Sequence, residues 1–361
     1  MQTLIVTAIG SFSASAVIRS CRACGFRVVG TEIHDPEDIA ESADVDRFVK
    51  VPRFDAGDAY LAALSEIARE ERALAILPLT DAELDLLNLH RALFRPAELW
   101  VSPEEAVRAA RNKETSRAAA ARAFAAGGRA VGHASGGETV LCPDRGLAAG
   151  GEAACLPDLS AHFSVIPTER VGDLGEEALL QRLPLILKPF DGRSSEGLFR
   201  VRTPRELSGA LRAIREEGRE TSYLVQPLLE GLVVCVDTVR GRDGTCISVP
   251  REEHRRTFNG AGLSVRVFRD PLLEAACAGI ARELGILGCV NFEFIRTEDG
   301  RYHFLECNPR FSGGTGFSAA AGCDVVKLHL EVFTGKSLPR ENPAAGCFAA
   351  KKYIEVVTKA C

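Results

Sequence analysis

Three polar residues at alternate positions close an apolar stretch in YHFLECNPRFSGGTGFS, residues 302–318. They are Glu306, Asn308 and Arg310. Alternate positions project from the same face of a strand. Carboxylate and amide oxygens are hard ligands of the kind that Mg²⁺ prefers. A guanidinium beside such a site is placed to bind a phosphate that the metal also touches.

The segment before it predicts a hairpin with a second carboxylate. VNFEFI and HFLECN are alternating strands around an Asp299-Gly300 turn signal, and we expect Phe304 to share the face of Glu306. A two-residue turn would place Glu293 opposite Glu306. A four-residue loop would place it opposite Phe304 on that same face, and a three-residue loop would move it to the other face.

Two like charges side by side destabilise a sheet, so a compensating cation is expected there. The alternative is a solvated face whose carboxylates pair with Arg301 or Arg310. The loop that follows is rich in glycine, which allows the backbone to approach a ligand closely. Its candidate substrate residues are Gly313, Gly314 and Thr315.

Two further segments could contact a nucleotide. In PLILKPFDGRSSEG, Lys188 ends an apolar strand, where an unpaired ammonium is unfavourable unless an anion binds it. The loop after it could cover phosphates; the alternative is a lysine that reaches solvent at a strand end before an ordinary hairpin. In YLVQPLLEG, an apolar linker could receive a flat heterocycle, and Glu230 could accept hydrogen bonds from ribose hydroxyls.

The first hundred residues alternate between continuous apolar runs and helical patterns, which is typical of parallel strands covered on both faces. Ligands of such sheets bind beyond the strand C-termini. The candidates there are Ser11 in GSFSAS, and Asp81 and Glu83 after LAILPL. Gly10, Ser11 and Ser13 can equally form a turn and helix cap, and Asp81 can cap the next helix.

Later segments differ from the first hundred residues in composition and in their pattern of strands. Residues 125–160 are dominated by Gly and Ala and are expected to form a loop-like insertion. From residue 184 onward, strands come in pairs with hairpin signals such as GRDG and EDG. The sequence therefore predicts a multidomain protein, α/β at its N-terminus and α+β afterwards.

Composition excludes several other classes. The net charge is −5, from 44 basic and 49 acidic residues, with no basic block, so nucleic acid is not expected as a partner. No segment is long and apolar enough for a membrane span, and no signal peptide is evident. We expect a cytoplasmic protein with reduced thiols. Cys21 and Cys24 are expected to pack in the core from one helix face, and the alternative is a metal or redox role for the pair.

Taken in order, these segments resemble the ATP-grasp enzymes, and most of all the branch of the carbamoyl phosphate synthetase large subunit and the pyrrolysine-biosynthesis ligase. NFEFI…FLECNPR carries the resemblance most specifically. It implies a Rossmann-like pre-ATP-grasp domain at residues 1–108, followed by a two-lobed ATP-grasp fold. The small lobe would span 109–225, including the insertion, and the C-terminal lobe 226–361 with the metal-binding hairpin.

The resemblance also implies a role for each matching residue, with ATP and Mg²⁺ (or Mn²⁺) as cofactors. Glu293, Glu306 and Asn308 would bind the metal, and Arg310 would stabilise the transferred phosphoryl group. Arg256, together with Arg251, lies where relatives often carry an arginine that faces phosphate or substrate. The residues implied for ATP binding are Lys113, Lys188, Ser194, Ser195, Gly197, Gln226, Leu228, Leu229 and Glu230.

The expected activity is that of an ATP-dependent carboxylate–amine ligase, which forms an amide bond through an acyl phosphate and releases ADP and phosphate. Its substrates would be small carboxylates and amines similar to amino acids, and relatives are often homodimers. One alternative is carbamoyl-phosphate-type chemistry on bicarbonate. The other is a nucleotide-binding protein without catalysis, although adenine binding alone needs none of Glu293, Glu306, Asn308 and Arg310.

Overall fold

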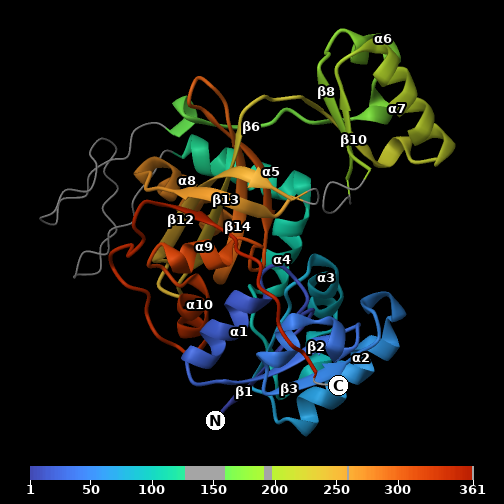
Figure 1. Ribbon diagram of the computed structural model, residues 1–361. Helices are drawn as coiled ribbons and strands as arrows, with labels where there is room; N and C mark the ends of the chain where they lie inside the picture. The colour runs from blue at the N-terminus through green and yellow to red at the C-terminus, as the bar shows by residue number, and fades with distance from the viewer. Residues whose placement is uncertain (127–158, 191–196, 258–259, 360–361) are drawn as a thin grey trace, which may run out of the picture.

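The computed structural model describes residues 1–126, 159–190, 197–257 and 260–359. The described residues form three sheets, which build an N-terminal domain, a small lobe and a large lobe (Figure 1). The expected insertion at 125–160 lies almost wholly outside the described residues, as do Ser194 and Ser195.

The N-terminal domain is a five-stranded parallel sheet with the order β3-β2-β1-β4-β5. β1 is buried at every position, which explains its uninterrupted apolar sequence. The predicted parallel α/β domain is thus confirmed. Its strands are β1 (Thr3–Val6), β2 (Arg27–Glu32), β3 (Arg47–Lys50), β4 (Ala75–Leu77) and β5 (Glu98–Leu99), with helices α1 (Ala14–Ala23), α2 (Asp58–Glu70), α3 (Asp81–Leu89) and α4 (Glu104–Arg111).

Two details of this domain differ from the sequence prediction. Cys21 is buried in α1, but Cys24 follows the last turn of the helix and is exposed, so only one of the pair packs in the core. Thr80, not Asp81, caps α3, because the Thr80 side chain accepts the Glu83 backbone N–H. The Asp81 carboxylate is therefore directed elsewhere.

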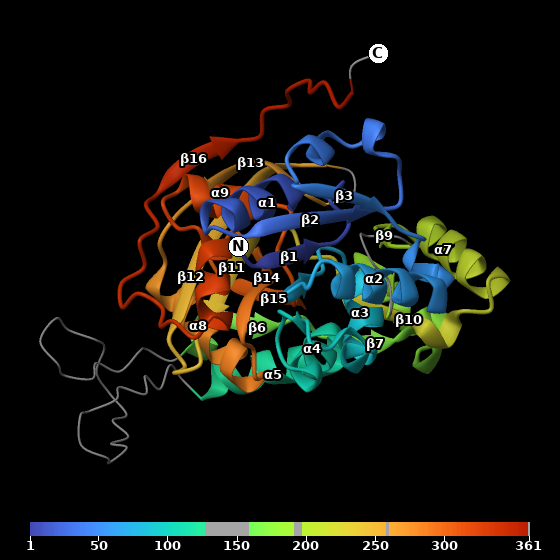
Figure 2. The same ribbon diagram turned by 90° about the horizontal axis from the view of Figure 1, so that it is seen from below.

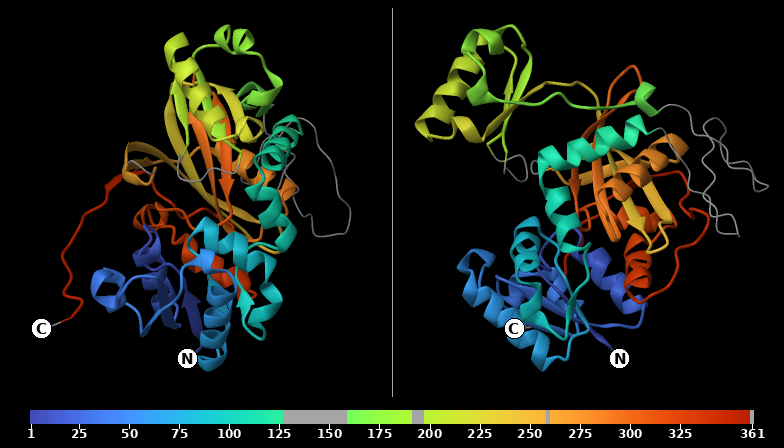
Figure 3. Two further views of the ribbon diagram at one scale, coloured as in Figure 1. Left: turned by 90° about the vertical axis from the view of Figure 1, so that its right-hand side faces the viewer. Right: turned by 180° about the vertical axis from the view of Figure 1, so that it is seen from behind.

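The small lobe is a four-stranded antiparallel sheet with the order β7-β10-β8-β9. Two extended connections, before β7 and after β10, join it to the rest of the molecule, from which it projects (Figure 3). Helix α7 begins with a capping box between Thr203 and Glu206. The elements are β7 (Glu169–Arg170), α6 (Glu176–Leu180), β8 (Leu185–Pro189), β9 (Phe199–Val201), α7 (Pro204–Glu216) and β10 (Tyr223–Pro227).

The large lobe is built on a seven-stranded sheet with the order β16-β13-β12-β11-β14-β15-β6. Its strands are β6 (Phe163–Val165), β11 (Leu232–Arg240), β12 (Cys246–Arg256), β13 (Gly262–Val267), β14 (Gly288–Arg296), β15 (Tyr302–Asn308) and β16 (Cys347–Ala350). Its helices are α5 (Lys113–Ala125), α8 (Pro271–Glu283), α9 (Thr315–Ala320) and α10 (Val325–Phe333).

Lobe boundaries differ from the expected 109–225 and 226–361. Helix α5 packs against α8 and β15, and β6 pairs with β15, so both belong to the large lobe. The small lobe thus begins after β6 and ends with β10, at Pro227. Helix α5 and β6 lie far before the rest of the large lobe in the sequence, and nothing in their local pattern indicates which lobe they join.

The two faces of the large sheet have different neighbours. Val290, Phe292 and Phe294 on β14 point into a core with α5 and α8, whereas Cys289 joins a core that includes β1, α1 and α10. Figure 2 shows the N-terminal sheet and α1 beside this second face. Asn291 and Glu293 continue along the second face, beyond its apolar part. The alternation of VNFEFI thus separates a dry core from a polar cavity.

Candidate active site

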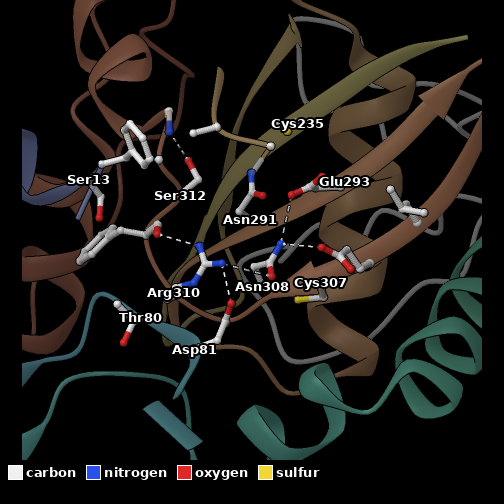
Figure 4. Close-up of a pocket in the computed structure, with 18 of the residues that line it drawn as sticks. Ser13, Thr80, Asp81, Cys235, Asn291, Glu293, Cys307, Asn308, Arg310 and Ser312 are labelled. Atoms are coloured by element: carbon white, nitrogen blue, oxygen red, sulfur yellow. Dashed lines mark hydrogen bonds and ion pairs between the residues drawn. The ribbon is translucent and has the colours of Figure 1, made fainter. Parts of the chain in front are cut away.

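A cavity of about 470 Å³ opens where the three parts of the chain meet, and the predicted polar hairpin forms one wall of it. Figure 4 shows Glu293 and Asn308 on neighbouring strands, with Arg310 and Asp81 beside them. The lining includes Ser11, Phe12, Ser13, Thr80, Asp81, Arg111, Lys113, Lys188, Phe190, Arg251, Glu253, Arg256, Gly260, Asn291, Glu293, Leu305, Glu306, Asn308, Arg310, Phe311, Ser312, Gly313 and Gly314.

The hairpin brings Glu293 directly opposite Glu306, but by an unexpected route. Thr297 N–H donates to the Arg301 carbonyl oxygen, so the loop has three residues, with Gly300 at a φ of +83°. That loop alone would put the two carboxylates on opposite faces. A bulge corrects the register, because Leu305 is an extra residue between the pairs Phe294–Phe304 and Glu293–Glu306.

The same bulge overturns one expectation. Phe304 does not share the face of Glu306; it pairs with Phe294 and is buried in the core beneath α5 and α8. Apolar burial anchors Phe304 on one face, and the inserted Leu305 lets the strand return its next polar residues to the cavity face.

Asn308 links the two carboxylates. Its Nδ2 donates to Glu293 Oε1 at 3.2 Å and to Glu306 Oε1 at 3.3 Å. Burial raises the pKa of Glu293, and the negative charge of Glu306 raises it further, although Arg256 opposes the shift. Ionised together, these two groups require a positive partner between them.

The residues present fit a divalent cation. Among the described residues, no three His, Cys, Asp or Glu side chains gather as a metal site, so the donors are two carboxylates and one amide. Mg²⁺ characteristically takes one or two carboxylates and completes its shell with water and phosphate oxygens. Glu293, Glu306 and Asn308 provide such a set.

Arg256 approaches the carboxylates from β12. Its Nε donates to the Gly260 carbonyl oxygen at 2.9 Å and lies 2.7 Å from Glu253 Oε2, and Nη2 lies 3.4 Å from Glu293 Oε2. Glu253 is buried and was not singled out in the sequence. A glutamate in the charged segment PREEHRR would ordinarily be expected to face solvent. Only the fold shows that Glu253 is buried and orients Arg256.

Arg251 is held deeper in the lobe. It is 1% exposed, and its Nη1 lies 2.8 Å from Asp237 Oδ2 while Nη2 donates to Ser312 Oγ at 2.9 Å. Ser312 Oγ donates in turn to Asp237 Oδ1 at 2.7 Å. This buried network fixes the start of the glycine-rich loop, where Gly313 and Gly314 line the cavity and Thr315 is buried outside its lining.

Two lysines face the hairpin from other elements. Burial lowers the pKa of Lys188, at the end of β8, to about 8, although Glu306 favours its charged form. Lys113, the first residue of α5, donates from Nζ to the Phe190 carbonyl oxygen at 2.6 Å. The Lys188 ammonium thus faces the carboxylates of the hairpin across the cavity. Lys113 instead links α5 to the small lobe through its hydrogen bond to Phe190.

The other described residues expected to bind nucleotide lie in the small lobe or directly after it, and they do not line this cavity. Gln226 is buried on β10, where its Nε2 donates to Thr168 Oγ1 at 2.6 Å. Leu228 N–H donates to the Pro184 carbonyl oxygen, and Glu230 pairs with Arg202 at 2.8 Å. Leu229 lies between them, and Gly197 has a φ of +68°.

On the N-terminal side, the structure separates the three expected substrate residues. Ser11 and Asp81 line the cavity, but Glu83 does not. Glu83 is buried and accepts hydrogen bonds from Thr7, Tyr60 and Thr80. The expectation that Glu83 faces a substrate is therefore corrected: its carboxylate is surrounded by hydroxyl donors of its own domain.

Comparisons with known proteins agree with the fold described above. Residues 219–356 match the family model described as ATP-grasp in the biosynthetic pathway with Ter operon. A biotin carboxylase from Campylobacter jejuni, solved with β,γ-ATP, superimposes with a TM-score of 0.68 at 17% identity, covering 93% of this chain and 72% of that one. The chain has an ATP-grasp fold.

A second ATP-grasp neighbour is N5-carboxyaminoimidazole synthetase from Staphylococcus aureus in complex with ADP. It has a TM-score of 0.66 at 16% identity and covers 94% of this chain and 78% of that one. The biotin carboxylase domain of the Hydrogenobacter thermophilus 2-oxoglutarate carboxylase, a dimer with MgADP and bicarbonate, has a TM-score of 0.66 at 19% identity, covering 94% and 71%.

In sequence, the carbamoyl phosphate synthase large chain of Caldanaerobacter subterraneus is 27% identical over 198 residues, which is 52% of this chain. The match covers 18% of the large chain, so this chain aligns with less than a fifth of that curated relative. The expected resemblance to the carbamoyl phosphate synthetase large subunit is thereby confirmed. The likeness to pyrrolysine-biosynthesis ligases stays a prediction.

Proposed function

We propose that this chain is an ATP-dependent carboxylate–amine ligase that forms a C–N bond through an acyl phosphate and releases ADP and phosphate. One observation carries the proposal. Glu293, Glu306 and Asn308 share a cavity with Arg310, and Lys188 faces them across it. Binding of adenine alone would require none of the hairpin charges.

The hairpin residues would hold Mg²⁺, which when bound neutralises charge on the nucleotide phosphates. Lys188 would contribute a second positive charge from the small lobe. Gln226 on β10, and Leu228, Leu229 and Glu230 directly after it, would contact adenine and ribose, with Lys113 and Gly197 near the phosphates. Two of the neighbours were solved with a bound nucleotide, which supports the proposal that this chain binds ATP.

In the first step, an oxygen of the substrate carboxylate attacks the γ-phosphorus and the bond to ADP breaks. Arg310 would stabilise the negative charge on the transferred group, a task of positioning and electrostatics. In the second step, the amine attacks the acyl carbon, phosphate leaves, and the amine loses a proton. Arg256 would orient the reacting groups from the opposite side of Glu293.

The acid and amine would be small and similar to amino acids, bound between Ser11 and the Gly313–Gly314 loop.

We place the reaction in the cytoplasm, where ATP and Mg²⁺ are abundant and the free thiols of the described residues are stable. A homodimer is also proposed, because the Hydrogenobacter thermophilus neighbour is a dimer. In the described residues, no helix is long and apolar enough to cross a membrane.

A second candidate is activation of bicarbonate to carboxyphosphate. The match to a carbamoyl phosphate synthase large chain and the neighbour solved with bicarbonate favour it. It differs from the first proposal only in the carboxylate that attacks ATP.

Nucleotide turnover tests both candidates. The chain is incubated with Mg-ATP and a panel of amino acids, small acids, amines and bicarbonate, and the products are resolved as ADP and phosphate or AMP and pyrophosphate. We expect ADP with particular acids and its loss in Glu306→Gln, whereas Glu298→Gln, in the exposed turn of the same hairpin, should retain activity. AMP would overturn the acyl-phosphate mechanism. ADP dependent on bicarbonate would favour the second candidate, and tight ATP binding without turnover would favour a binding protein.

A further inference from the structure

Arg310 of the large lobe is held by a residue of the N-terminal domain. Its Nη2 lies 2.7 Å from Asp81 Oδ2, although the two residues are 229 positions apart in the sequence. Figure 4 shows the Asp81 carboxylate directed at the Arg310 guanidinium from the neighbouring domain. Both side chains are largely buried, at 20% and 15% exposed, so this pair is shielded from solvent.

A second guanidinium holds the other oxygen of the same carboxylate. Arg111, on α4, lies 3.3 Å from Asp81 Oδ1 through its Nη1. Arg111 is itself held by Asp85, since its Nε and Nη2 donate to the two Asp85 oxygens at 2.9 and 3.1 Å. Asp81 therefore lies between two arginines, one of which is anchored within the N-terminal domain.

This arrangement argues against a substrate role for Asp81. A carboxylate that neutralises two guanidinium groups carries little net negative potential with which to attract a substrate ammonium. Its place in the first turn of α3 adds the positive potential of the helix N-terminus to that of the two arginines.

The remaining contacts of Arg310 lead to the hairpin. Its Nη2 lies 3.5 Å from Asn308 Oδ1, and its Nη1 donates to the Phe311 carbonyl oxygen at 3.2 Å. Asn308 in turn contacts Glu293 and Glu306. Polar contacts therefore run from Asp85 through Arg111, Asp81 and Arg310 to the carboxylate pair.

We propose that Asp81 is a positioning residue for phosphoryl transfer: it orients Arg310 toward the phosphate, and the N-terminal domain thereby completes the active site of the lobes. This inference rests on the proposed function and adds a role for Asp81 that the comparisons do not assign. Loss of the Asp81 carboxylate should allow the Arg310 side chain to change its orientation. The guanidinium would then no longer be held in one position relative to the phosphoryl group that is transferred.

The test compares Asp81→Asn with Glu105→Gln, which removes an exposed charge from α4 that pairs with Arg108 and lies outside the polar chain. Asp81→Asn should lower kcat on the order of 10- to 100-fold and leave the Kd for ATP and the KM of the acid nearly unchanged. Glu105→Gln should stay close to wild type. The double variant Asp81→Asn/Arg310→Lys should be no slower than Arg310→Lys alone, because both changes disable the same interaction.

Four results would overturn the inference. A rise in the KM of the acid or amine at constant kcat would assign Asp81 to substrate binding. Equal loss of kcat and of melting temperature in Asp81→Asn and Glu105→Gln would reduce Asp81 to a structural role. Multiplicative effects of Asp81→Asn and Arg310→Lys on kcat would show that the two residues act independently. An active wild type with an unaffected Asp81→Asn refutes only this inference, whereas an inactive wild type refutes the proposed function on which it rests.

Discussion

Glu293 on β14 lies directly opposite Glu306 on β15, and the pairing depends on one inserted residue, Leu305. The three-residue turn would otherwise send the two carboxylates to opposite faces of the sheet. The cavity face thus holds two like charges that a folded protein would avoid unless a cation offsets them.

The metal-free protein should gain stability when one of these charges is removed. We expect Glu306→Gln to raise the free energy of unfolding in EDTA by about 0.2–1 kcal/mol, the usual size of a cross-strand pair effect. Added Mg²⁺ should stabilise the wild type, because it binds only the folded hairpin, and should have less effect on the variant. Urea unfolding with and without Mg²⁺ measures both. Equal stabilisation of the two proteins by Mg²⁺ would exclude Glu306 as a ligand.

Deletion of Leu305 should remove the bulge and rotate one carboxylate toward the phenylalanine core. The cost should be about 3–5 kcal/mol, comparable to that of an unpaired buried charge, or folding should fail. Leu305→Ala keeps the register and should cost only about 1 kcal/mol. Urea midpoints of the two variants distinguish a register effect from loss of a side chain. Similar midpoints would mean that the bulge does not fix the register.

Lys188 should make nucleotide affinity depend on pH. Burial lowers its pKa to about 8, so the ammonium that would bind phosphate is present below that pH and is lost above it. The Kd for ADP should therefore rise above pH 8 by up to about tenfold per unit, because binding then requires uptake of a proton. Lys188→Arg keeps its charge and should show a flat profile. Calorimetric titration of both proteins with ADP, below and above pH 8, measures this dependence. A wild-type Kd that does not change with pH would show that Lys188 does not bind the phosphates.

Two neighbouring glycines should respond oppositely to a methyl group. A Cβ on Gly314 would lie 2.5–2.6 Å from the Arg251 guanidinium, which is buried and fixed by Asp237. Gly314→Ala should therefore cost about 1–3 kcal/mol. A Cβ on Gly316, in α9, would lie 3.5 Å from Ala16, an ordinary contact, so Gly316→Ala should be neutral or stabilise by about 0.5 kcal/mol. Thermal unfolding of the two variants measures the change in stability. Equal changes in Gly314→Ala and Gly316→Ala would contradict the close packing at Gly314.

The sequence predicted the parallel N-terminal sheet, the paired strands and the carboxylate hairpin, because their periodicity is local. It did not predict the bulge at Leu305, since nothing in HFLECN indicates which residue is unpaired. It also assigned Asp81 to capping or substrate binding. The pairing of Asp81 with Arg310 joins segments 229 positions apart, and only tertiary packing brings them together.

Glu83 illustrates the converse case. Its position after a strand suggested a ligand, but three hydroxyl groups from Thr7, Tyr60 and Thr80 hold it inside the N-terminal domain. Burial of a carboxylate depends on donors from distant segments, which spacing along the chain does not reveal. Arg111, two residues before Lys113, was not predicted as a site residue, because its partners Asp81 and Asp85 lie in a different segment of the chain.

The central claim is that a substrate carboxylate is phosphorylated. It is tested most directly with ¹⁸O in both carboxylate oxygens of the acid that supports turnover, followed by mass analysis of the released phosphate. The account predicts that each phosphate carries one ¹⁸O, because the oxygen that attacks the γ-phosphorus leaves with it. ADP formation with phosphate free of label would contradict the acyl-phosphate mechanism.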